Sequence, residues 1–369
     1  MRSFNKYLRF IFMHPKDAYH VLIKRITGFS YYPEKERKNI MLILVDQIRH
    51  LLKYGKPERF YFLYGLDTRY GQEYDSYVSY PIFMKRRDFL NYKQKPECNN
   101  CCILRDKFLF GIYSKSLGIL TPPNRFYYKN GVLYDLQDRE EGLFSEISFS
   151  RLCESEHHLF VKSIKGECGY EVFKLDICNE RILLNNVYTS ISKLKKYLEG
   201  NDFIFQENVV QHHLMASLNP SSLNTLRLIT VRNLQSGIVK VWPSELRIGV
   251  QGSNVDNATQ GGIIVGVNLS NGTLKKYGFQ RPEFGGRSDR HPNSGIKYSD
   301  FTIPYFKEAV QKAIFFHSML KDIHSIGWDI AFTENGPIFI EGNDNWEITG
   351  IQATNGGMKN IFNEDFYIQ

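Results

Sequence analysis

The sequence has no apolar run long enough to cross a membrane. Its longest uncharged apolar run is Ile40–Val45, whereas a membrane-spanning helix needs roughly 20 apolar residues. The N-terminal residues also lack the uninterrupted apolar core and the small-residue cleavage site of a signal peptide. These absences predict a protein that stays in the cytoplasm.

Cysteine is scarce, and its placement indicates a reducing compartment. The 6 cysteines of the 369-residue chain follow no disulfide framework. Cys98, Cys101 and Cys102 lie close together, but no second Cys-x-x-Cys pair or nearby histidine completes the four ligands of a structural zinc site. Ordinary thiols are therefore the favoured interpretation of these three residues.

Acidic residues are too few to balance the basic ones, and the formal net charge is +8. This excess favours an acidic partner, such as a nucleotide, an anionic sugar, a membrane surface or a nucleic acid. Within residues 1–30, six Lys or Arg residues are opposed only by Asp17. Two interpretations stay open: a segment that makes peripheral contact with a membrane, or a solvated helix that packs one face on the next domain. Nothing resembles a recognition module for nucleic acid, so we expect no such partner.

The length and the mixture of patterns predict an α+β protein of two or three domains that share a cleft. Residues 1–104 are rich in aromatic residues and show no clear repeat. We assign them to an N-terminal helical or α/β domain. Residues 105–369 form the second unit, in which the signals for helices and strands are sharper.

Helix and strand signals follow one another from residue 105. Asp106 is a good N-cap for a helix with apolar positions at 109, 112, 113 and 117. Strands are predicted on both sides of a loop at 163–169 within residues 158–177, and again at 202–212, 223–233 and 239–249. A helix is predicted to begin at Pro304 and to end at Gly327.

The sequence GWDIAFTENGPIFIEGN, residues 327–343, predicts a β-hairpin. A two-residue loop at Asn335 and Gly336 would scatter the apolar residues over both faces. A three-residue loop with Gly336 in the left-handed conformation gathers the large apolar residues on one face, with Phe339 left on the other. The apolar pattern therefore favours the three-residue loop.

This register pairs Asp329 with Glu341 and Ile330 with Ile340. Directly opposed residues are about 4.5 to 5.5 Å apart at Cβ, so both carboxylates and the Asn343 carbonyl can share a cation. Hard oxygen ligands indicate Mg²⁺ or Mn²⁺ rather than zinc. Because bound Mg²⁺ usually completes its shell with water and phosphate oxygens, the site implies a nucleoside triphosphate. The alternative is an exposed sheet face with ordinary polar residues.

Two lysines are placed to hold phosphate. Lys162 ends a strand directly before the glycine-bearing loop, whose amides can cover a phosphate. Lys107 lies in the first turn of its helix, where the helix amides add positive potential. For each lysine the alternative is an ordinary exposed side chain.

In this order the pieces resemble the ATP-grasp fold. The matching segments are DKFLFGIYSKSLGILTPP, FVKSIKGECGYEVF, FIFQENVVQH and WDIAFTENGPIFIEGN. Between them, SLNTLRLITV, ELRIGVQGSNVDNATQGGIIVGVN and HPNSG resemble the sugar-transfer-associated ATP-grasp proteins of bacterial exopolysaccharide and capsule gene sets. The resemblance covers residues 105–355, and the N-terminal hundred residues carry less of the signature.

The resemblance implies two subdomains that hold ATP between them, with a hinge near residues 206–212 and adenine against Gln206 and Glu207. It assigns the phosphate contacts to Lys107, Lys162, Gly166 and Gly169, and the Mg²⁺ ligands to Asp329, Glu341 and Asn343. Arg227 and Arg247 become candidates to steady the transferring phosphoryl group, or else form ion pairs within the sheet. The chain departs from many relatives because QHHLMASLNP, after the hinge, has no acidic residue for the ribose hydroxyls. His291 either contacts the acceptor or acts as a base, or else it is a turn histidine.

The implied activity is that of an ATP-dependent carboxylate ligase. In such enzymes a carboxylate attacks the γ-phosphate, and an amine then displaces phosphate from the acyl phosphate, so the protein mainly positions groups and neutralises charge. We expect small-molecule or sugar-linked carboxylate and amine substrates from surface polysaccharide biosynthesis. One alternative is an ATP-grasp phosphotransferase. Another is a non-catalytic ATP-binding scaffold docked on membrane-bound glycosyltransferases at the inner face of the membrane.

Overall fold

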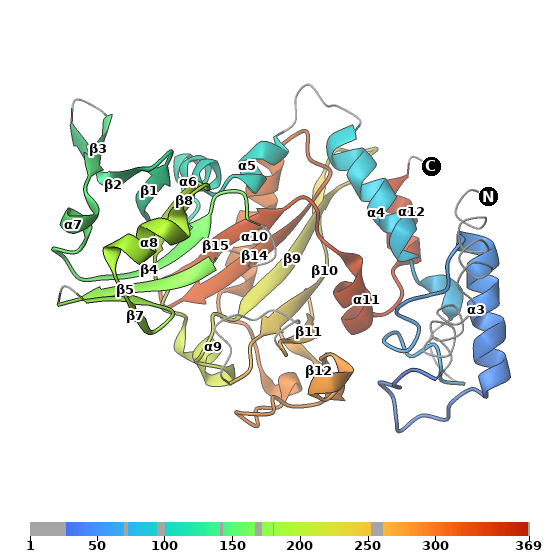
Figure 1. The fold of residues 1–369 in the computed structure, drawn as a ribbon. Helices are drawn as coiled ribbons and strands as arrows, with labels where there is room; N and C mark the ends of the chain where they lie inside the picture. Colours follow the sequence, from blue (N-terminus) through green and yellow to red (C-terminus); the bar gives the residue numbers. More distant parts are fainter. Residues whose placement is uncertain are drawn as a thin grey trace, which may run out of the picture.

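The computed structural model describes residues 27–69, 73–93, 100–140, 143–166, 172–179, 181–251 and 261–367. The basic segment before residue 27, together with Gly169 and residues 252–260, lies outside the described residues. Two antiparallel sheets form the body of the described chain, with helices around them (Figure 1). This mixture of sheets and helices confirms the predicted α+β class.

The first sheet has eight strands in the order β3-β2-β1-β8-β4-β5-β6-β7. Its strands are β1 (Asn124–Lys129), β2 (Val132–Glu140), β3 (Leu143–Ile147), β4 (His157–Ser163), β5 (Val172–Cys178), β6 (Arg181–Leu184), β7 (Val187–Thr189) and β8 (Phe203–Glu207). The short helices α7 (Phe149–Leu152) and α8 (Ile191–Leu198) cover one face. Leu159 and Val161 of β4 and Phe203 and Phe205 of β8 point into the core on that face. The alternate residues of β4 and β8 therefore point to the opposite face.

The second sheet has seven strands in the order β13-β12-β11-β10-β9-β14-β15. Its strands are β9 (Thr225–Arg232), β10 (Val239–Ile248), β11 (Ile263–Val267), β12 (Leu274–Phe279), β13 (Arg287–Ser288), β14 (Ser325–Thr333) and β15 (Gly336–Asn343). Helix α9 (His213–Leu218) lies between the two sheets in the sequence, and the 3₁₀ turns η4 (Pro282–Phe284) and η5 (Tyr298–Asp300) follow β12 and β13. Strand β9 separates β10 from the hairpin of β14 and β15, so residues about a hundred positions apart become neighbours.

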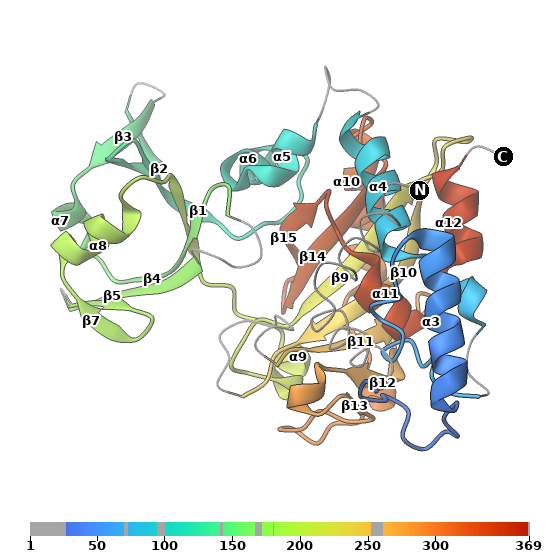
Figure 2. The same ribbon diagram turned by 45° about the vertical axis from the view of Figure 1, so that its right-hand side comes forward.

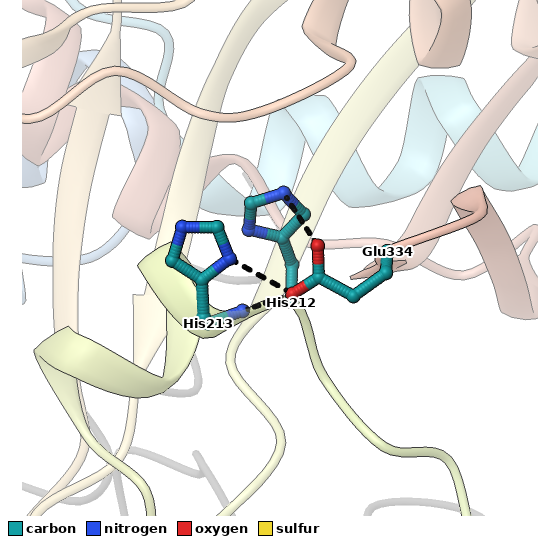
Figure 3. Close-up of side chains that lie close together, drawn as sticks. All are labelled: His212, His213 and Glu334. Atoms are coloured by element: carbon teal, nitrogen blue, oxygen red, sulfur yellow. Dashed lines mark hydrogen bonds and ion pairs between the residues drawn. The ribbon is translucent and has the colours of Figure 1, made fainter.

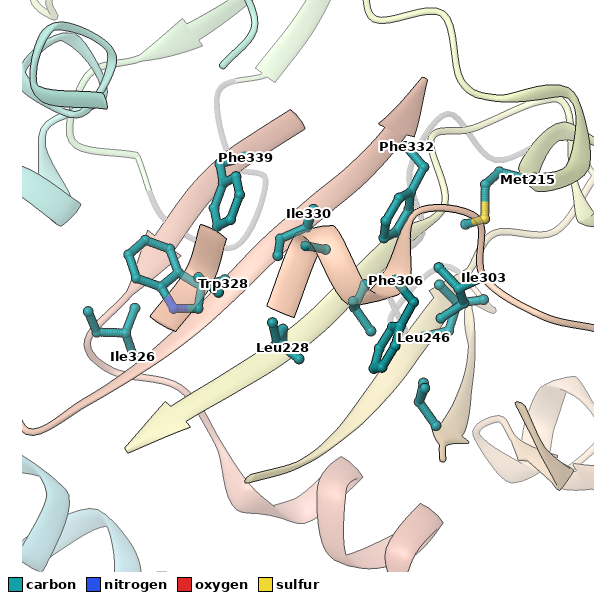
Figure 4. Packing of buried hydrophobic residues seen from close by; sticks show 14 of the residues in the cluster. Met215, Leu228, Leu246, Ile303, Phe306, Ile326, Trp328, Ile330, Phe332 and Phe339 are labelled. Atoms are coloured by element: carbon teal, nitrogen blue, oxygen red, sulfur yellow. The ribbon is translucent and has the colours of Figure 1, made fainter. Parts of the chain in front are cut away.

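Apolar side chains cover both faces of the second sheet. On one face, helix α10 (Phe306–Met319) packs its side chains against Leu228, Trp328 and Phe339 (Figure 4). On the other face, α11 (Ile348–Asn355) and α12 (Lys359–Phe366) enclose Trp242 and Trp346. Polar residues on this second face therefore lie beside a buried aromatic cluster.

Among the described residues, the helices before the first sheet are α3 (Ile40–Tyr54), α4 (Tyr80–Asp88), α5 (Cys101–Arg105) and α6 (Lys107–Ser116), with short turns η1 (Tyr74–Ser76) and η2 (Phe89–Lys93). The first two helices share buried clusters with the C-terminal helices. Phe83 of α4 contacts the Trp346 ring at 4.7 Å between centroids, and the Gln352 amide exchanges hydrogen bonds of 2.8 and 3.1 Å with the Val78 backbone. The N-terminal region thus shares a core with α11 and α12, while the boundary at residue 104 stays a prediction.

The hairpin confirms one part of the predicted register and contradicts another. Asp329 pairs with Glu341 as predicted, but Ile330 pairs with Phe339 and not with Ile340. The turn has two residues, closed by Thr333 opposite Gly336, and the irregularity in pairing lies at Ile340. The bulge therefore sits inside the strand and not at the turn, which moves Phe339 onto the apolar face that contacts Trp328.

The helix predictions also need correction. Helix α6 begins after the Asp106 cap as predicted, where the carboxylate accepts hydrogen bonds from the backbone of residues 108 and 109. Its predicted apolar positions 109 and 112 are exposed, because Phe110 stacks on Phe316 of α10 and turns a different side of the helix inward. Helix α10 ends at Met319, and Gly327, the predicted stop, is instead part of β14.

Gly327 has a packing role in β14 that leads to a first prediction. A Cβ atom at this position would lie 2.7 Å from the Trp346 Cβ and 3.2 Å from the Arg227 Cδ. We expect Gly327→Ala to lower the free energy of unfolding by about 1 to 3 kcal/mol, the usual cost of overpacking a core. Urea unfolding followed by tryptophan fluorescence measures this change. An unchanged midpoint and slope would show that Trp346 moves aside freely.

Candidate functional site

Four charged residues form one row across the second sheet. Glu245 of β10 pairs with Arg227 of β9, Arg227 pairs with Asp329 of β14, and Asp329 pairs with Glu341 of β15. Directly paired residues project to the same face of a sheet. The row carries one cation and three carboxylates, so its outer end has an excess of negative charge.

Asp329 is the best anchored member of the row. Arg227 donates to it through two bonds, from Nε to Oδ1 at 2.6 Å and from Nη2 to Oδ2 at 2.8 Å. Arg247 adds a longer contact of 3.6 Å from Nη1 to Oδ1. Burial alone raises the pKa of Asp329, but the two guanidinium groups outweigh it and lower the pKa to about 2. Asp329 is therefore charged at neutral pH.

Glu341 and Asn343 complete an oxygen-rich cluster beside Asp329. The Asn343 Nδ2 atom lies 3.3 Å from Asp329 Oδ2 and 3.2 Å from Glu341 Oε1, and it donates to both. Burial, followed by the nearby Asp329 charge, raises the pKa of Glu341. A cation here would relieve this repulsion, and rotating the Asn343 amide would exchange its nitrogen for an oxygen ligand. The donor set therefore fits Mg²⁺ or Mn²⁺.

The two predicted lysines converge on this cluster from outside the second sheet. Lys162 of β4 lies on the face of the first sheet opposite its core. Burial lowers the pKa of Lys162 to about 8, with the Glu341 carboxylate raising it and the Lys107 ammonium lowering it. Lys107, at the start of α6, donates from Nζ to the Gly166 carbonyl at 2.6 Å. Both ammonium groups thus lie close enough to Glu341 to interact electrostatically with its carboxylate.

Helix α5 fixes Lys107 relative to the hairpin. Arg105, at the end of α5, binds the buried Asp344 carboxylate just after β15, with Nη2 to Oδ2 at 2.6 Å and Nε to Oδ1 at 3.1 Å. The backbone of Phe339 donates to the Leu120 carbonyl at 2.8 Å, which ties the exit of α6 to the same strand. Helix α6 is therefore held beside β15 by contacts before its first residue and after its last.

The two predicted adenine contacts lie on opposite faces of the first sheet. Gln206 pairs with Phe160 in β4 and shares the face of Lys162. Its Nε2 atom donates to Asn124 at 2.9 Å, whereas its buried Oε1 atom has no hydrogen-bond partner among the described residues. That oxygen can accept from the amino group of a nucleobase. Glu207 instead lines a surface hollow with His157 and Arg125 on the other side of the sheet.

Two residues predicted for the site, His291 and Gly166, make hydrogen bonds within the protein. His291 is fully buried, its Nε2 atom is 2.9 Å from the Gly249 carbonyl, and its Nδ1 atom accepts from the Ser294 backbone at 3.3 Å. Both ring nitrogens are therefore engaged within the protein. Gly166 contributes its carbonyl to Lys107 in this structure.

Glu245 is a residue that the motifs did not indicate. It is buried beside Arg227, and its Oε1 atom lies 3.8 Å from Arg247 Nε. Its Oε2 atom has no hydrogen-bond partner within the described chain. Burial raises the pKa of Glu245, and the Arg247 and Arg227 guanidinium groups oppose the rise. No sequence motif could place Glu245 beside Arg227, because this contact depends on the pairing of β9 with β10.

A second cluster joins the segment after the hinge to the turn of the hairpin (Figure 3). Glu334 Oε1 accepts from the His213 backbone and from His213 Nδ1, both at 2.9 Å, and Oε2 is 3.4 Å from His212 Nε2. His212 Nδ1 accepts from the Leu214 backbone N–H at 3.1 Å. Neutral His212 must therefore carry its proton on Nε2, the atom that faces Glu334. The cluster is arranged as a hydrogen-bonded clasp and not as a set of metal ligands.

We expect this clasp not to bind zinc. Coordination through His212 Nε2 would require loss of its proton and of the bond from Leu214, which costs more than an exposed three-ligand site returns. Adding Zn²⁺ to the chelator-treated protein should leave its melting temperature unchanged to within the error of the scan. A zinc-dependent rise in the wild type that disappears in His213→Ala would contradict this assignment.

The comparison with protein families identifies the class of the molecule. Lys162 on the first sheet and Lys107 on α6 lie near the carboxylate cluster of the second sheet, as the ATP-grasp resemblance implies. The family model described as sugar-transfer associated ATP-grasp matches residues 99–363. The chain therefore belongs to the sugar-transfer associated ATP-grasp family. No curated protein matches it.

Solved structures with similar folds include several ligases. D-alanine–D-alanine ligase from Bacillus anthracis, complexed with ATP, has 14% identity and a TM-score of 0.35 over 72% of this chain and 63% of its own. The Helicobacter pylori D-alanine–D-alanine ligase has 13% identity and a TM-score of 0.38 over 72% and 58%. N5-carboxyaminoimidazole ribonucleotide synthetase from Thermotoga maritima has 16% identity and a TM-score of 0.34 over 66% and 42%. The chain thus spans less than two thirds of each structure, and likeness at these scores does not bear on mechanism.

Among the described residues, no helix is both long enough and apolar enough to span a bilayer.

Proposed function

We propose that the protein is an ATP- and Mg²⁺-dependent carboxylate ligase that makes an amide or related bond through an acyl phosphate. Its substrates would be a small or sugar-linked acid and an amine, used in surface polysaccharide biosynthesis. The observation that carries the proposal is the convergence of Lys107 and Lys162 on the carboxylates of Asp329 and Glu341. Phosphates and a divalent cation together satisfy both sets of charges.

In the proposed reaction the acceptor carboxylate oxygen attacks the γ-phosphorus of ATP, and ADP leaves. The amine nitrogen then attacks the acyl carbon, inorganic phosphate leaves, and the nitrogen loses a proton. Asp329, Glu341 and Asn343 would hold Mg²⁺, which when bound neutralises phosphate charge. Lys162 and Lys107 would hold the phosphates, and the free Gln206 Oε1 atom would accept from adenine. The chain's own contribution is positioning and electrostatic stabilisation.

Arg227 and Arg247 would have different roles. Arg227 is buried and uses two donors on Asp329, so it positions that carboxylate. Arg247 is less buried, and its contacts with Asp329 and Glu245 are longer than 3.5 Å. The donors of Arg247 can therefore turn toward a phosphoryl group.

This difference predicts distinct effects for two variants. Arg247→Gln should keep ATP binding but lower turnover by roughly 10² to 10³-fold, the usual loss when one donor to developing charge is removed. Arg227→Gln should lower the melting temperature first, because it leaves Asp329 buried without its partner. Thermal scans with ATP and steady-state ADP release separate the two. Equal loss of binding and turnover in Arg247→Gln would contradict its assignment.

The activity itself is tested by ADP release from ATP and Mg²⁺ with panels of sugar acids, amino acids and amines. Hydroxylamine added without the amine should trap the acyl phosphate as a hydroxamate, and mass spectrometry should find the amide beside ADP. A phosphorylated acceptor that persists when amines are present would favour the phosphotransferase. ATP binding without turnover on any panel would favour the scaffold docked on membrane-bound glycosyltransferases.

A further inference from the structure

Helix α3 exposes an apolar stripe that the protein core does not use. Met41, Val45, Ile48 and Leu52 recur at the spacing i, i+4, i+7 and i+11, which places them on one face. Their exposed fractions lie between 45% and 68%. Ile40 and Leu42 at the start of the helix are exposed as well. A continuous apolar stripe of this length on a surface helix indicates a contact with something outside the described chain.

The other face of α3 accounts for the stability of the helix. Ile43 is buried in a small cluster with aromatic residues of the segment 60–77. Gln47 exchanges hydrogen bonds with the Glu58 backbone at 2.9 and 3.3 Å, and His50 Nε2 is 2.9 Å from the Glu58 carboxylate. The cap at Asn39 and the left-handed Gly55 close the two ends. The exposed stripe is therefore not needed to hold the helix in place.

The stripe lies far from the candidate site. In Figure 1 α3 lies at the outer edge of the molecule, and in both views α11 lies between it and the second sheet (Figures 1 and 2). A shallow hollow of about 520 Å³ follows the stripe and is lined by Val45, Ile48, Arg49, Leu52 and Lys53. Whatever covers this face can bind without blocking the carboxylate cluster.

The charges around the stripe are mostly positive. Arg49 and Lys53 line the hollow together with the apolar residues. Two carboxylates lie nearby: Asp46 of α3, which is 2.8 Å from Lys38 Nζ, and Asp75, which accepts from Lys53 Nζ at 2.7 Å. Each carboxylate thus has a lysine partner, and Arg49 and the exposed Lys56 add further positive charge. An apolar stripe flanked by basic residues is the pattern of a helix that lies in a membrane interface.

We propose that α3 is a docking surface for a lipid bilayer with anionic headgroups. The apolar stripe would enter the boundary between headgroups and acyl chains, with Arg49 and Lys53 beside the phosphates. Charge decides between this and other occupants. A second copy of the chain would bring the same cations face to face, and residues 1–26 carry six Lys or Arg against Asp17, so neither complements the surface. An anionic bilayer does, and the proposal does not depend on the reaction proposed above.

The test is flotation of the full chain with vesicles at 150 mM salt. One set is phosphatidylcholine alone, and the other contains 30 mol% phosphatidylglycerol. Wild type should float with the anionic vesicles at least tenfold more than with the neutral ones. The variant Ile48→Ser with Leu52→Ser should lose binding about tenfold or more, because serine removes most of the apolar surface that each side chain would bury in the bilayer. The control is Val187→Ser with Ile238→Ser, two similarly exposed apolar residues, one at the start of β7 and one just before β10.

Each outcome bears on the proposal. Loss of flotation in the α3 pair but not in the control pair, with thermal unfolding unchanged in both, supports it. Weaker binding in Arg49→Gln with Lys56→Gln, and a drop in wild-type binding at 500 mM salt, support the electrostatic part. No flotation of wild type, or equal flotation of wild type and the α3 pair, overturns the proposal. A concentration-dependent dimer in sedimentation that the α3 pair abolishes overturns it in favour of a second copy.

Discussion

Glu341→Gln should remove the Mg²⁺-dependent part of ATP binding while making the ligand-free protein more stable. Burial and the Asp329 charge raise the pKa of Glu341 in the folded protein, so its ionised form is destabilising there. A neutral glutamine of the same shape relieves that repulsion at pH 7. The same substitution removes one of the proposed metal ligands. We expect the affinity for Mg²⁺ to fall by at least the roughly 10 to 100-fold that is lost when a residue that only orients a ligand is changed.

The measurement is thermal unfolding with and without ATP, each with and without Mg²⁺. A ligand at 100 times its dissociation constant stabilises the native state by about 2.7 kcal/mol, so the wild-type shift should be large and Mg²⁺-dependent. Glu364→Gln is the matched control, because this exposed carboxylate pairs with Lys240 on the surface. The metal assignment fails if Glu341→Gln keeps the full Mg²⁺-dependent shift. As pH falls through the raised pKa of Glu341 toward its ordinary value of 4.5, the wild-type carboxylate becomes protonated in the folded protein, so the extra stability of the variant should disappear.

Lys162→Met should raise the dissociation constant for ATP by roughly 10 to 100-fold, the equivalent of one charged hydrogen bond to phosphate. Lys162 shares the inner face of the first sheet with Gln206 and lies near Lys107 and Glu341. Isothermal titration with ATP and Mg²⁺ measures the change. Lys129→Met is the control on the same sheet, since Lys129 is exposed at the end of β1. Equal affinities for wild type and Lys162→Met would place the phosphates elsewhere.

The pKa of Lys162 adds a pH dependence with a defined sign. In the folded protein it is lowered from 10.5 to about 8, so the ammonium needed for phosphate is lost as pH rises through 8. ATP affinity should therefore fall between pH 7 and pH 9 in the wild type but change less in Lys162→Met. The stability of the ligand-free protein should instead rise with pH. Between pH 8 and 10.5 the unfolded chain binds more protons than the folded one, so Lys162 destabilises the fold most below pH 8. The ligand-free variant should be more stable than wild type at pH 7, and the difference should shrink toward pH 10.5.

Local patterns in the sequence were enough to predict the strands that carry the site. The hairpin of β14 and β15 brings Asp329 opposite Glu341, as the apolar pattern indicated. The predicted reason was wrong, because the extra residue sits at Ile340 and not in the turn. Bulge position depends on what packs against each face, and the place of Phe339 beside Trp328 is set by α10. A pattern within one hairpin contains no information about that helix.

Contacts between distant segments could not be predicted from the sequence. Arg227 was a candidate for catalysis or for an ion pair, and its bidentate bond to Asp329 exists only because β9 pairs with β14. Glu245 joins the same row through β10. Strand order is decided by which apolar faces can be buried together, and many orders are compatible with one set of strands.

The sequence by itself determined the class of the protein, the family and the residue types of the site. Alternation of apolar and polar residues encodes each strand, because side chains on a strand alternate between two faces. Only the tertiary structure decided that Lys162 lies close to Glu341, that Gln206 shares the face of Lys162, and that α3 leaves an apolar stripe uncovered. Electrostatic interactions and burial depend on distance in space, and the packing of two sheets and their helices sets those distances.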